Sequence, residues 1–548
     1  MGIEKNEEIS INFEKFKKIK LSYIFLFLFL VLGVYLRIYH LDFPSIGYHN
    51  MKENEYLDEA IFFNEQGDFL HRRTFNFWGL ENGPGYFEEY AQMPLIPYVT
   101  TLFWKILGSE PLWVPRILMI LSMLGSIVTI YLVAKKLFNN EYISLLSSFL
   151  LSVMPLGIYF GRNIQPESPA LLFMLLGFNF YLNWIKTFEK KQILYSTLFF
   201  GIMSLFKYTF LIALVPVAFI FPFKKFFSLK TKEKFTQTLY AFLGFIPFLF
   251  FQTLYEVTIQ DRTKIAPELS LQKFSSFITS SYWAKTWPSL ASYIRDNFTW
   301  WFFWFAIIGL LFILLKYRTQ FSKFLIGYAA SAFVYGLLLT SKIGGHSYYQ
   351  MPYLPLVCIL SAYFFFNLGM LMKQIFKIKY LIYVPLLLML LTVPEMQAAN
   401  DRVWNTIFYG QDIVGQYIKA NTNDSERFFN LGQSQSYAVC TYARRRCGSF
   451  NNLSQLIELE NKFNISYMNI DSYSMSQLLE KNSTLNYIEN NYKIELLGAI
   501  KEGNNLVPVN FLLKRGGKFN FTEMNQKTPK LAEVYQIKGG EVEFYILK

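Results

Sequence analysis

Acidic side chains at helical spacing lie in the segment GYHNMKENEYLDEAIFF, residues 47–63. A positioned carboxylate can act as a general base, which takes the proton from an attacking hydroxyl group. Glu55 and Glu59 are four residues apart, and Glu55 and Asp58 are three apart, so a helix places all three on one face. The alternative interpretation is a surface helix lying on a membrane, whose acids are only solvated.

Two cationic side chains are candidates for neutralising a negatively charged ligand. Arg162 lies in YFGRNIQPESP, residues 159–169, where a proline-containing turn separates it from Glu167. The alternative for this turn is a helix start, where Glu167 favours the helix dipole. Lys207 lies in LFKYTF, between two short apolar runs with no polar loop to explain it. A cation there is costly unless it meets an anion such as a lipid phosphate; the alternative is a lysine that snorkels to the interface.

A further candidate cluster lies in SKIGGHSYYQMPYLP, residues 341–355. His346, Tyr348 and Tyr349 follow two glycines that permit a tight turn. Tyrosines are ordinary at membrane interfaces, so this cluster is informative only with the others. An acid, two cations and a histidine around one cavity suit a substrate that carries a phosphate and a group that is displaced in the reaction. The acid would be the base, and the cations would stabilise the leaving phosphate.

The elements that must position these residues are membrane helices. The chain has 548 residues, of which 53% are hydrophobic and 17% are charged, whereas about a quarter of a soluble protein is charged. The net charge of +13 does not indicate nucleic-acid binding, because the basic residues lie between long apolar runs and not in one patch. Segments of about 20 apolar residues predict transmembrane helices. Eleven candidate spans are 21–38, 116–134, 142–160, 169–185, 192–206, 208–223, 237–255, 300–315, 324–340, 351–368 and 380–396.

The basic residues give these spans an orientation. With residues 1–20 in the cytoplasm as a basic N-terminus, the loops on that side hold most of the lysines, as the positive-inside rule expects. These are Lys135, Lys136, Lys186, Lys190, Lys191, Lys224, Lys225, Lys230, Lys232, Lys234, Lys316, Arg318, Lys323, Lys373, Lys377 and Lys379. The short outer loops hold Arg162, Lys207 and Lys342. All the candidate clusters then fall on the extracytoplasmic side.

Three larger segments lie on that outer side. Residues 39–115 form a first loop, in which 93–108 is predicted to be an interfacial helix because it is short and has prolines near its start. Residues 256–299 form a second large loop, and residues 397–548 form a C-terminal extracytoplasmic domain. NLVPVNFLLK and VEFYILK alternate in polarity and predict strands, so this domain is expected to be α/β or α+β. Cys440 and Cys447 lie in it and could pair as a disulfide, and Cys358 is expected to be buried.

Two stretches resemble a known family, the C-type membrane glycosyltransferases, which include protein O-mannosyltransferases and lipid A aminoarabinose transferases. The stretch RILMILSMLGSIVTIYLVAKKLFNNEYISLLSSFLLSVMPLGIYFGRNIQPESPALLF, residues 116–173, is similar to the family's second to fourth spans. It has an arginine that opens the span, a basic-Leu-Phe turn, and an exit with proline, tyrosine and arginine followed by an acid. GHSYYQMPYLPL, residues 345–356, is similar to the family's entry to a late helix. The resemblance covers about 21–370.

The resemblance implies a many-helix core over 21–396 and a polyprenyl-phosphate sugar as donor. It also implies a base in the first loop, in a pattern of Asp-Glu, then Tyr three residues later, then Ala. Glu53, Tyr56 and Ala60 fit this spacing, and Lys52 stands where the Asp is usual. The base is therefore Glu53, favoured by spacing, or Glu55. Glu167 stands where an Asp is frequent and is a third candidate catalytic acid. Lys207 matches a lysine thought to face the donor phosphate.

The sequence thus predicts a bacterial inner-membrane glycosyltransferase with polyprenyl-phosphate sugar as donor and a lipid, glycan or protein hydroxyl as acceptor. The donor phosphate is expected to contact Lys207, Arg162, His346, Tyr348 and Tyr349. No cofactor is certain, and a divalent metal stays open, with Glu167 and His346 as its candidate ligands. The alternatives are a transporter or flippase of a lipid-linked substrate, which usually shows repeated halves and mid-bilayer charges, and a non-catalytic membrane scaffold.

Overall fold

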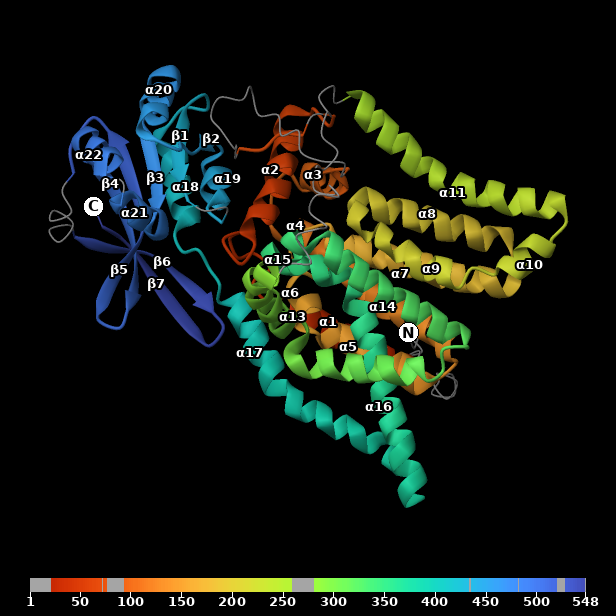
Figure 1. Ribbon diagram of the computed structural model, residues 1–548. Coiled ribbons are helices and arrows are strands. Elements are labelled where there is room, and N and C mark those ends of the chain that lie inside the picture. Colours follow the sequence, from red (N-terminus) through yellow and green to blue (C-terminus); the bar gives the residue numbers. More distant parts are fainter. Residues whose placement is uncertain are drawn as a thin grey trace, which may run out of the picture.

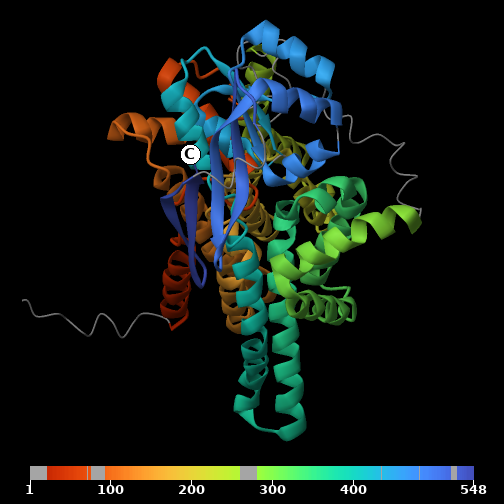
Figure 2. The same cartoon turned by 90° about the vertical axis from the view of Figure 1, so that its left-hand side faces the viewer.

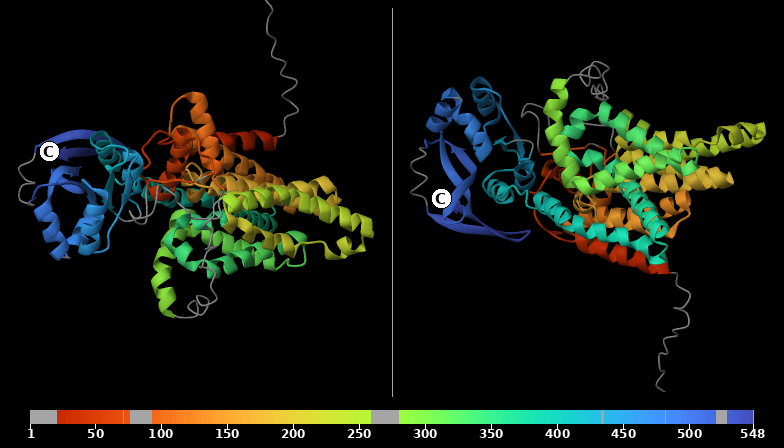
Figure 3. Two further views of the ribbon diagram at one scale, coloured as in Figure 1. Left: turned by 90° about the horizontal axis from the view of Figure 1, so that it is seen from above. Right: turned by 60° about the horizontal axis from the view of Figure 1, so that its bottom comes forward.

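The structure, a computed structural model, describes residues 21–70, 72–75, 93–258, 280–432, 435–480, 482–519 and 528–547. It consists of a large helical bundle, two helices from the first loop and a C-terminal sheet domain (Figure 1). In Figure 1 the sheet domain lies to the left of the bundle. In Figure 2 the paired helical segments α16 (Leu354–Phe376) and η6 (Lys379–Thr392) extend downward, away from the sheet. Two further views agree with this arrangement (Figure 3).

The bundle follows the predicted spans closely. Its helices are α1 (Leu21–Arg37), α4 (Trp113–Phe138), α5 (Glu141–Val153), α6 (Pro155–Tyr159), α7 (Glu167–Thr187), α8 (Lys190–Phe206), η2 (Tyr208–Ala213), α9 (Leu214–Phe219), α10 (Phe223–Ser228), α11 (Thr231–Thr258), α13 (Ser280–Leu314), α14 (Gln320–Leu338), α15 (Thr340–Gly345), η5 (Ser347–Tyr353), α16 (Leu354–Phe376), η6 (Lys379–Thr392) and α17 (Val393–Trp404). Each of the eleven predicted spans falls on one to three of these elements. Residues 1–20, expected in the cytoplasm, lie outside the described residues.

Six helical segments of the described chain are long and apolar enough to cross a membrane. They are Trp113–Phe138, Glu167–Thr187, Thr231–Phe251, Trp283–Leu314, Ser347–Phe376 and Lys379–Trp404. Predicted spans 142–160 and 208–223 are broken into short pieces, because Pro155 starts a new helix inside the first and a 3-10 turn opens the second. The helix expected over 93–108 is α3 (Leu95–Leu107). Its 13 residues measure about 20 Å, which is less than the bilayer core.

The long hydrophobic segments keep much of their apolar surface uncovered. Only 11% of the apolar window is buried in Thr231–Phe251, and the same share in Lys379–Trp404. Exposed apolar surface of this extent is expected where helices face lipid. The region 256–299, expected to be a loop, is helical from Ser280, because α13 runs through it to Leu314 with a break at Thr299.

The C-terminal domain is a mixed α/β unit. Its seven-stranded sheet has the order β2-β1-β3-β5-β4-β7-β6, with β1 (Arg427–Leu431), β2 (Arg446–Gly448), β3 (Tyr467–Asp471), β4 (Tyr492–Glu502), β5 (Asn505–Arg515), β6 (Pro529–Ile537) and β7 (Gly540–Leu547). β1 is parallel to β2 and β3, and the remaining pairs are antiparallel. The helices are α18 (Gln411–Asn421), α19 (Tyr437–Ala443), α20 (Leu453–Phe463), α21 (Ser472–Leu479) and α22 (Asn482–Asn491). The two predicted strands are β5 and β7, and Cys440 and Cys447 form a disulfide.

The acid-rich segment of the first loop is helix α2 (Asn50–Gln66), and it is enclosed by the rest of the molecule. Its apolar side chains Tyr56, Leu57 and Ile61 belong to one buried cluster with Val414 and Val439 of the C-terminal domain. The same cluster includes residues of α3 and α4. The sheet domain and the bundle therefore hold α2 between them, and this fixes the direction in which each acid points.

Candidate functional site

Four of the five acids of α2 are buried, namely Glu53, Glu55, Asp58 and Glu59, so the interpretation of a solvated surface helix is wrong. Their exposed fractions are 3% for Glu53, 8% for Glu55, 1% for Asp58 and 0% for Glu59. A buried carboxylate requires a cation, hydrogen-bond donors or a bound proton. The partners of each acid therefore show what it can do.

Glu53 lies in a cluster with Arg116 and Arg162, here called the arginine–glutamate cluster. The Arg116 Nε donates to Glu53 Oε1 at 3.2 Å, and its second nitrogen donates to Oε2 at 3.3 Å, which is a bidentate pair. Ser45 Oγ and the backbone nitrogen of Ile164 also donate to the carboxylate, at 2.7 and 3.4 Å. Burial would raise the pKa of Glu53, but the two arginines and Ser45 hold this pKa below its ordinary value. Glu53 is thus an ionised carboxylate with both oxygens in use.

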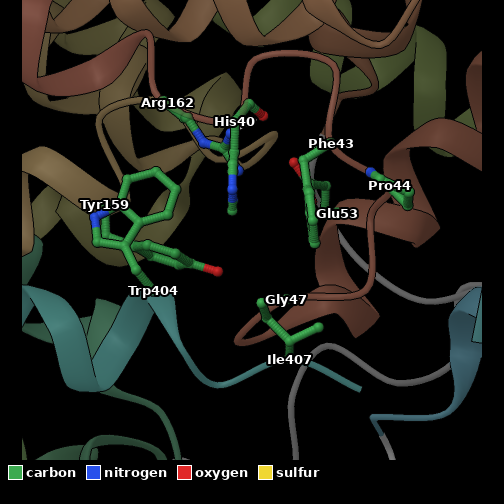
Figure 4. Close-up of a pocket in the computed structure, with 9 residues that line it drawn as sticks. All are labelled: His40, Phe43, Pro44, Gly47, Glu53, Tyr159, Arg162, Trp404 and Ile407. Atoms are coloured by element: carbon green, nitrogen blue, oxygen red, sulfur yellow. Dashed lines mark hydrogen bonds between the residues drawn. The ribbon is translucent and has the colours of Figure 1, made fainter. Parts of the chain in front are cut away.

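Arg162 is held by backbone and aromatic contacts on the same side. Its guanidinium donates to the carbonyl oxygens of Tyr39, at 3.0 Å, and His40, and lies 4.7 Å from the ring centroid of Trp404. Figure 4 shows Arg162 and Trp404 on one side of a small cavity, with Glu53 on the other. The arginine–glutamate cluster therefore forms a closely packed junction between the first loop, the bundle and the segment that leads to the sheet domain.

A second group, here called the lysine cluster, consists of Lys207, Glu167, Tyr348, Tyr349, His49 and His346. Lys207 follows the last residue of α8 in an extended conformation, and Glu167 is the first residue of α7. Their side chains form an ion pair in which the lysine is 6% and the glutamate 1% exposed. The Lys207 ammonium also lies 4.5 and 4.6 Å from the ring centroids of Tyr348 and Tyr349. This lysine is therefore a desolvated cation that meets an anion and two aromatic faces.

The histidines of the lysine cluster have unused hydrogen-bonding atoms. The ring centroids of His49 and His346 are 5.5 Å apart, and His49 lies 5.2 Å from Tyr348. Burial, with His346 and Lys207, lowers the pKa of His49 to about 3. Burial, with Lys52, Lys342 and Lys207, lowers that of His346 to about 4. Both rings are neutral near pH 7.

Several buried polar atoms of this cluster are unsatisfied within the described chain. Both ring nitrogens of His49, Nδ1 of His346 and Oε2 of Glu167 have no hydrogen-bond partner there. Buried polar atoms without partners are rare, because each costs free energy. A group of them around one cation is the arrangement expected where a polar ligand or water completes the site.

Glu55 lies at the border of the lysine cluster. Its carboxylate accepts from Lys52 Nζ at 2.6 Å, and this is its one ion pair among the described residues. Glu53 and Glu55 are two residues apart on one helix, so they point to different sides. The charge of Glu55 acts on the ionisation of Lys207 and Tyr348. The ionisation of Glu53 depends instead on the charges of Arg116 and Arg162. The two candidate bases therefore face different clusters.

Asp58 and Glu59 face the segment 72–75 and the sheet domain. Asp58 Oδ2 accepts from the backbone nitrogen of Phe75 at 3.0 Å, and burial raises the pKa of Asp58 to about 8. Glu59 pairs with Arg72, whose Nε lies 2.7 Å from the carboxylate. These two acids anchor the first loop.

The structure thus brings together five of the eight predicted site residues in the lysine cluster, namely Glu167, Lys207, His346, Tyr348 and Tyr349. Glu55 lies beside them. Glu53 and Arg162, which were expected in the same chamber, lie together in the arginine–glutamate cluster. Three residues had no site role predicted from the sequence: His49 and Lys52, which stand in the acid-rich segment, and Arg116, which pairs with Glu53.

The two candidate metal ligands, Glu167 and His346, both belong to the lysine cluster. Glu167 and His346 supply two donors, but across the residues that the structure describes no group of three or more His, Cys, Asp or Glu could hold a metal ion. The Lys207 ammonium against Glu167 also opposes a divalent cation at that carboxylate. The two residues as placed do not fit a metal site.

Comparisons with known proteins agree on the fold. Residues 91–251 match the family model described as dolichyl-phosphate-mannose-protein mannosyltransferase. The Archaeoglobus fulgidus oligosaccharyltransferase with zinc and sulfate aligns with a TM-score of 0.59 and 12% identity, over 88% of this chain and 72% of that chain. ArnT from Cupriavidus metallidurans bound to undecaprenyl phosphate aligns with a TM-score of 0.51 and 12% identity. This alignment covers 89% of this chain and 97% of the ArnT chain. The chain has the fold of a C-type membrane glycosyltransferase. No curated protein sequence matches it.

A further alignment includes a lipid phosphate complex of the same fold. The archaeal oligosaccharyltransferase AglB from Archaeoglobus fulgidus, in complex with an inhibitory peptide and a dolichol-phosphate, has a TM-score of 0.56 and 12% identity, over 91% of this chain and 74% of that chain. The expected resemblance to C-type glycosyltransferases is confirmed at the level of fold. Within this C-type fold, the lysine cluster lies where α7, α8, η5 and α2 meet.

Proposed function

We propose that the chain is an integral membrane glycosyltransferase that transfers a sugar from a polyprenyl-phosphate donor to a hydroxyl group of a lipid, glycan or protein. The acceptor oxygen forms a bond to the anomeric carbon, and the bond from that carbon to the phosphate oxygen breaks. The acceptor proton goes to a carboxylate, and polyprenyl phosphate leaves. The C-type fold and the family match over residues 91–251 support this class of reaction.

The observation that carries the proposal is the desolvated Lys207 beside unsatisfied polar atoms. A lipid phosphate would supply the anion that a buried ammonium requires, and its oxygens would accept hydrogen bonds from the neutral histidines. Glu167 holds the ammonium in place before the donor arrives. The cation then stabilises charge that develops on the departing phosphate.

Glu55 is the better candidate for the general base. Glu53 uses both oxygens for Arg116, Ser45 and a backbone nitrogen, so an incoming hydroxyl would have to displace one of them. Glu55 has a single ion pair with Lys52, which is 28% exposed, and it borders the lysine cluster. A hydroxyl group can therefore approach Glu55 while the donor phosphate contacts Lys207.

We place the active site on the extracytoplasmic side of the inner membrane, with the N-terminus in the cytoplasm. Helix α7 begins at Glu167 and has Lys186 in its last turn, and its 21 residues measure about 31 Å, which is one bilayer core. Helix α4 likewise has Lys135 and Lys136 in its last turn. The helix ends that carry lysines thus lie opposite the cluster, as the positive-inside rule expects. The C-terminal domain then lies on the extracytoplasmic side, which suits its disulfide.

A transfer assay tests the proposal. The full chain in nanodiscs would receive a panel of polyprenyl-phosphate sugars with a labelled sugar and a mixed membrane extract as acceptor. We expect label on an acceptor with one polyprenyl phosphate released for each sugar, and turnover reduced by about 100-fold or more in Glu55→Gln. Glu141→Gln, at the exposed first position of α5, should leave turnover unchanged. Movement of the labelled lipid across the bilayer without covalent transfer would instead favour the transporter or flippase.

A further inference from the structure

The turn between α6 and α7, residues 160–166, is here called the amide turn because it carries two buried side-chain amides. Asn163 and Gln165 are each 1% exposed. The nitrogen and the oxygen of both amides have no hydrogen-bond partner among the residues that the structure describes. Buried polar atoms without a partner cost free energy and are rare. The two amides therefore indicate that a polar group from outside the chain binds at this turn.

The backbone of the amide turn is fixed by contacts with the rest of the molecule. The Arg162 guanidinium donates to carbonyl oxygens of the first loop. The backbone nitrogen of Ile164 donates to Glu53 Oε1 at 3.4 Å, and the Ile164 side chain belongs to the buried cluster that includes α2 and α3. The Gln165 backbone nitrogen donates to the Asn163 carbonyl oxygen at 2.8 Å. The two amides thus stand on a preorganised backbone, as expected for residues that bind a ligand.

The amide turn connects the two groups that the proposed reaction requires. Directly after the turn, Glu167 pairs with Lys207, where the donor phosphate is proposed to bind. In the turn, the Ile164 backbone nitrogen contacts α2, the helix that carries the candidate base Glu55. Gln165 is two residues before Glu167, so their Cα atoms are at most about 7 Å apart. The donor's anomeric carbon must lie between the phosphate and the base, so the turn borders the place of the donor's sugar.

A side-chain amide matches the hydrogen bonds of a hydroxyl group, because its nitrogen donates and its oxygen accepts, while a hydroxyl group does both. Oε2 of Glu167 also lacks a partner within the described chain, and it adds an acceptor beside the two amides. Several hydroxyl groups on one sugar ring suit this set. An amino sugar would bring a second cation toward Lys207, and an acidic sugar a second anion toward Glu167, whereas an uncharged sugar brings neither.

We propose that Asn163 and Gln165 bind hydroxyl groups of the donor's sugar, and that this sugar is uncharged. The inference rests on the proposed transferase function, but the binding itself does not require turnover. A site that forms hydrogen bonds to substrate hydroxyl groups discriminates strongly against analogues that lack them. The amide turn would therefore select the sugar, whereas Lys207 holds the phosphate that every such donor shares.

Native mass spectrometry of the full chain in detergent tests this inference through lipid affinities. The probes are undecaprenyl phosphate and the undecaprenyl-phosphate derivatives of glucose, mannose and galactose. We expect at least one hexose lipid to bind about tenfold or more tightly than the bare lipid phosphate. Asn163→Leu and Gln165→Met should each lower this ratio about threefold or more, since each removes hydrogen bonds to the sugar. The double variant should bring the ratio near one, with the affinity for undecaprenyl phosphate unchanged.

Thermal unfolding separates binding from a structural role of the amides. Gln165→Met should not lower the unfolding midpoint, because its amide atoms have no partner to lose. Gln237 is a matched control, since its buried amide donates to the Phe188 carbonyl oxygen at 2.7 Å and accepts from Trp184 Nε1 at 3.0 Å. Gln237→Met should lower the midpoint and leave the preference for the hexose lipid unchanged.

Three results would overturn the inference. These are equal affinity for undecaprenyl phosphate and all three hexose lipids, a wild-type ratio in the double variant, and a lower unfolding midpoint of Gln165→Met with an unchanged ratio. Tighter binding of undecaprenyl-phosphate aminoarabinose than of every hexose lipid would overturn the uncharged sugar. In each case wild-type binding of undecaprenyl phosphate leaves the donor phosphate site standing. Absence of that binding would instead count against the proposed function.

Discussion

Replacing Glu167 by glutamine should lower the stability of the protein, because it removes the buried anion that pairs with Lys207. The two side chains form an ion pair with exposed fractions of 1% and 6%. Removing one partner of a buried pair leaves an uncompensated charge, which costs about 3–5 kcal/mol. The Tyr348 and Tyr349 rings stay within 4.6 Å of the ammonium and supply part of the lost attraction. We therefore expect Glu167→Gln to lose about 3 kcal/mol.

The same substitution should make the protein more responsive to the donor lipid. In the wild type, a phosphate must share Lys207 with Glu167, whereas in Glu167→Gln the phosphate is the partner that restores charge balance. Undecaprenyl phosphate should bind the variant about tenfold more tightly, and its stabilising effect grows with the ratio of lipid concentration to dissociation constant. Thermal unfolding in detergent, with and without undecaprenyl phosphate, measures both effects.

An exposed ion pair provides the control. Lys135 and Glu141 lie 2.8 Å apart with side chains 32% and 48% exposed, so Glu141→Gln should change stability by less than about 1 kcal/mol. It should also leave the response to the lipid unchanged. The reasoning is refuted if Glu167→Gln is as stable as the wild type and gains no more from the lipid than the wild type does.

Three further predictions follow from buried groups. Glu53→Gln should weaken the buried ion pair with Arg116 and cost about 3–5 kcal/mol of stability. Glu55→Gln should instead lower turnover with little change in thermal unfolding. The opposite pattern would make Glu53 the base. Burial raises the pKa of Asp58 to about 8 in the folded protein, so folded Asp58 holds a proton more tightly than unfolded Asp58. The wild type should therefore lose stability relative to Asp58→Asn as pH rises from about 4 to about 8. Denaturation at several pH values measures that difference, and a constant difference would contradict it. Replacing Cys440 and Cys447 by serine should lower the free energy of unfolding by about 2–3 kcal/mol, because the disulfide closes a loop with a sequence separation of 7. Equal unfolding of the variant and the wild type would show that the disulfide adds no stability.

The helical elements were predictable because hydrophobic length is a local property. Each predicted span falls on one to three helical elements of the structure, and β5 and β7 follow the alternating patterns. The breaks at Pro155 and after Lys207 shorten some helices below a bilayer core, since local turns interrupt runs that look continuous by hydropathy. The helix inside 256–299 was missed because its polar first half lacks a hydrophobic run.

The side-chain partners of the site were less predictable, because they depend on contacts between distant parts of the chain. Lys207 was singled out by its apolar surroundings, and its anion is Glu167, 40 residues earlier. The burial of α2 depends on the C-terminal domain, since Leu57 of α2 belongs to one buried cluster with Val414 and Val439, more than 350 positions away. Spacing alone favoured Glu53, whereas tertiary contacts join Glu53 to Arg116 and leave Glu55 beside the lysine cluster. Arg116 was detectable only as the arginine that opens a span.

A structure of the full chain in nanodiscs with undecaprenyl phosphate tests the central claim most directly. We predict phosphate density within hydrogen-bonding distance of Lys207 Nζ, with the ion pair to Glu167 opened or shared and the histidine nitrogens facing the phosphate. Phosphate density beside Arg162 and Glu53, or at the helix ends that carry Lys135 and Lys186, would contradict the account.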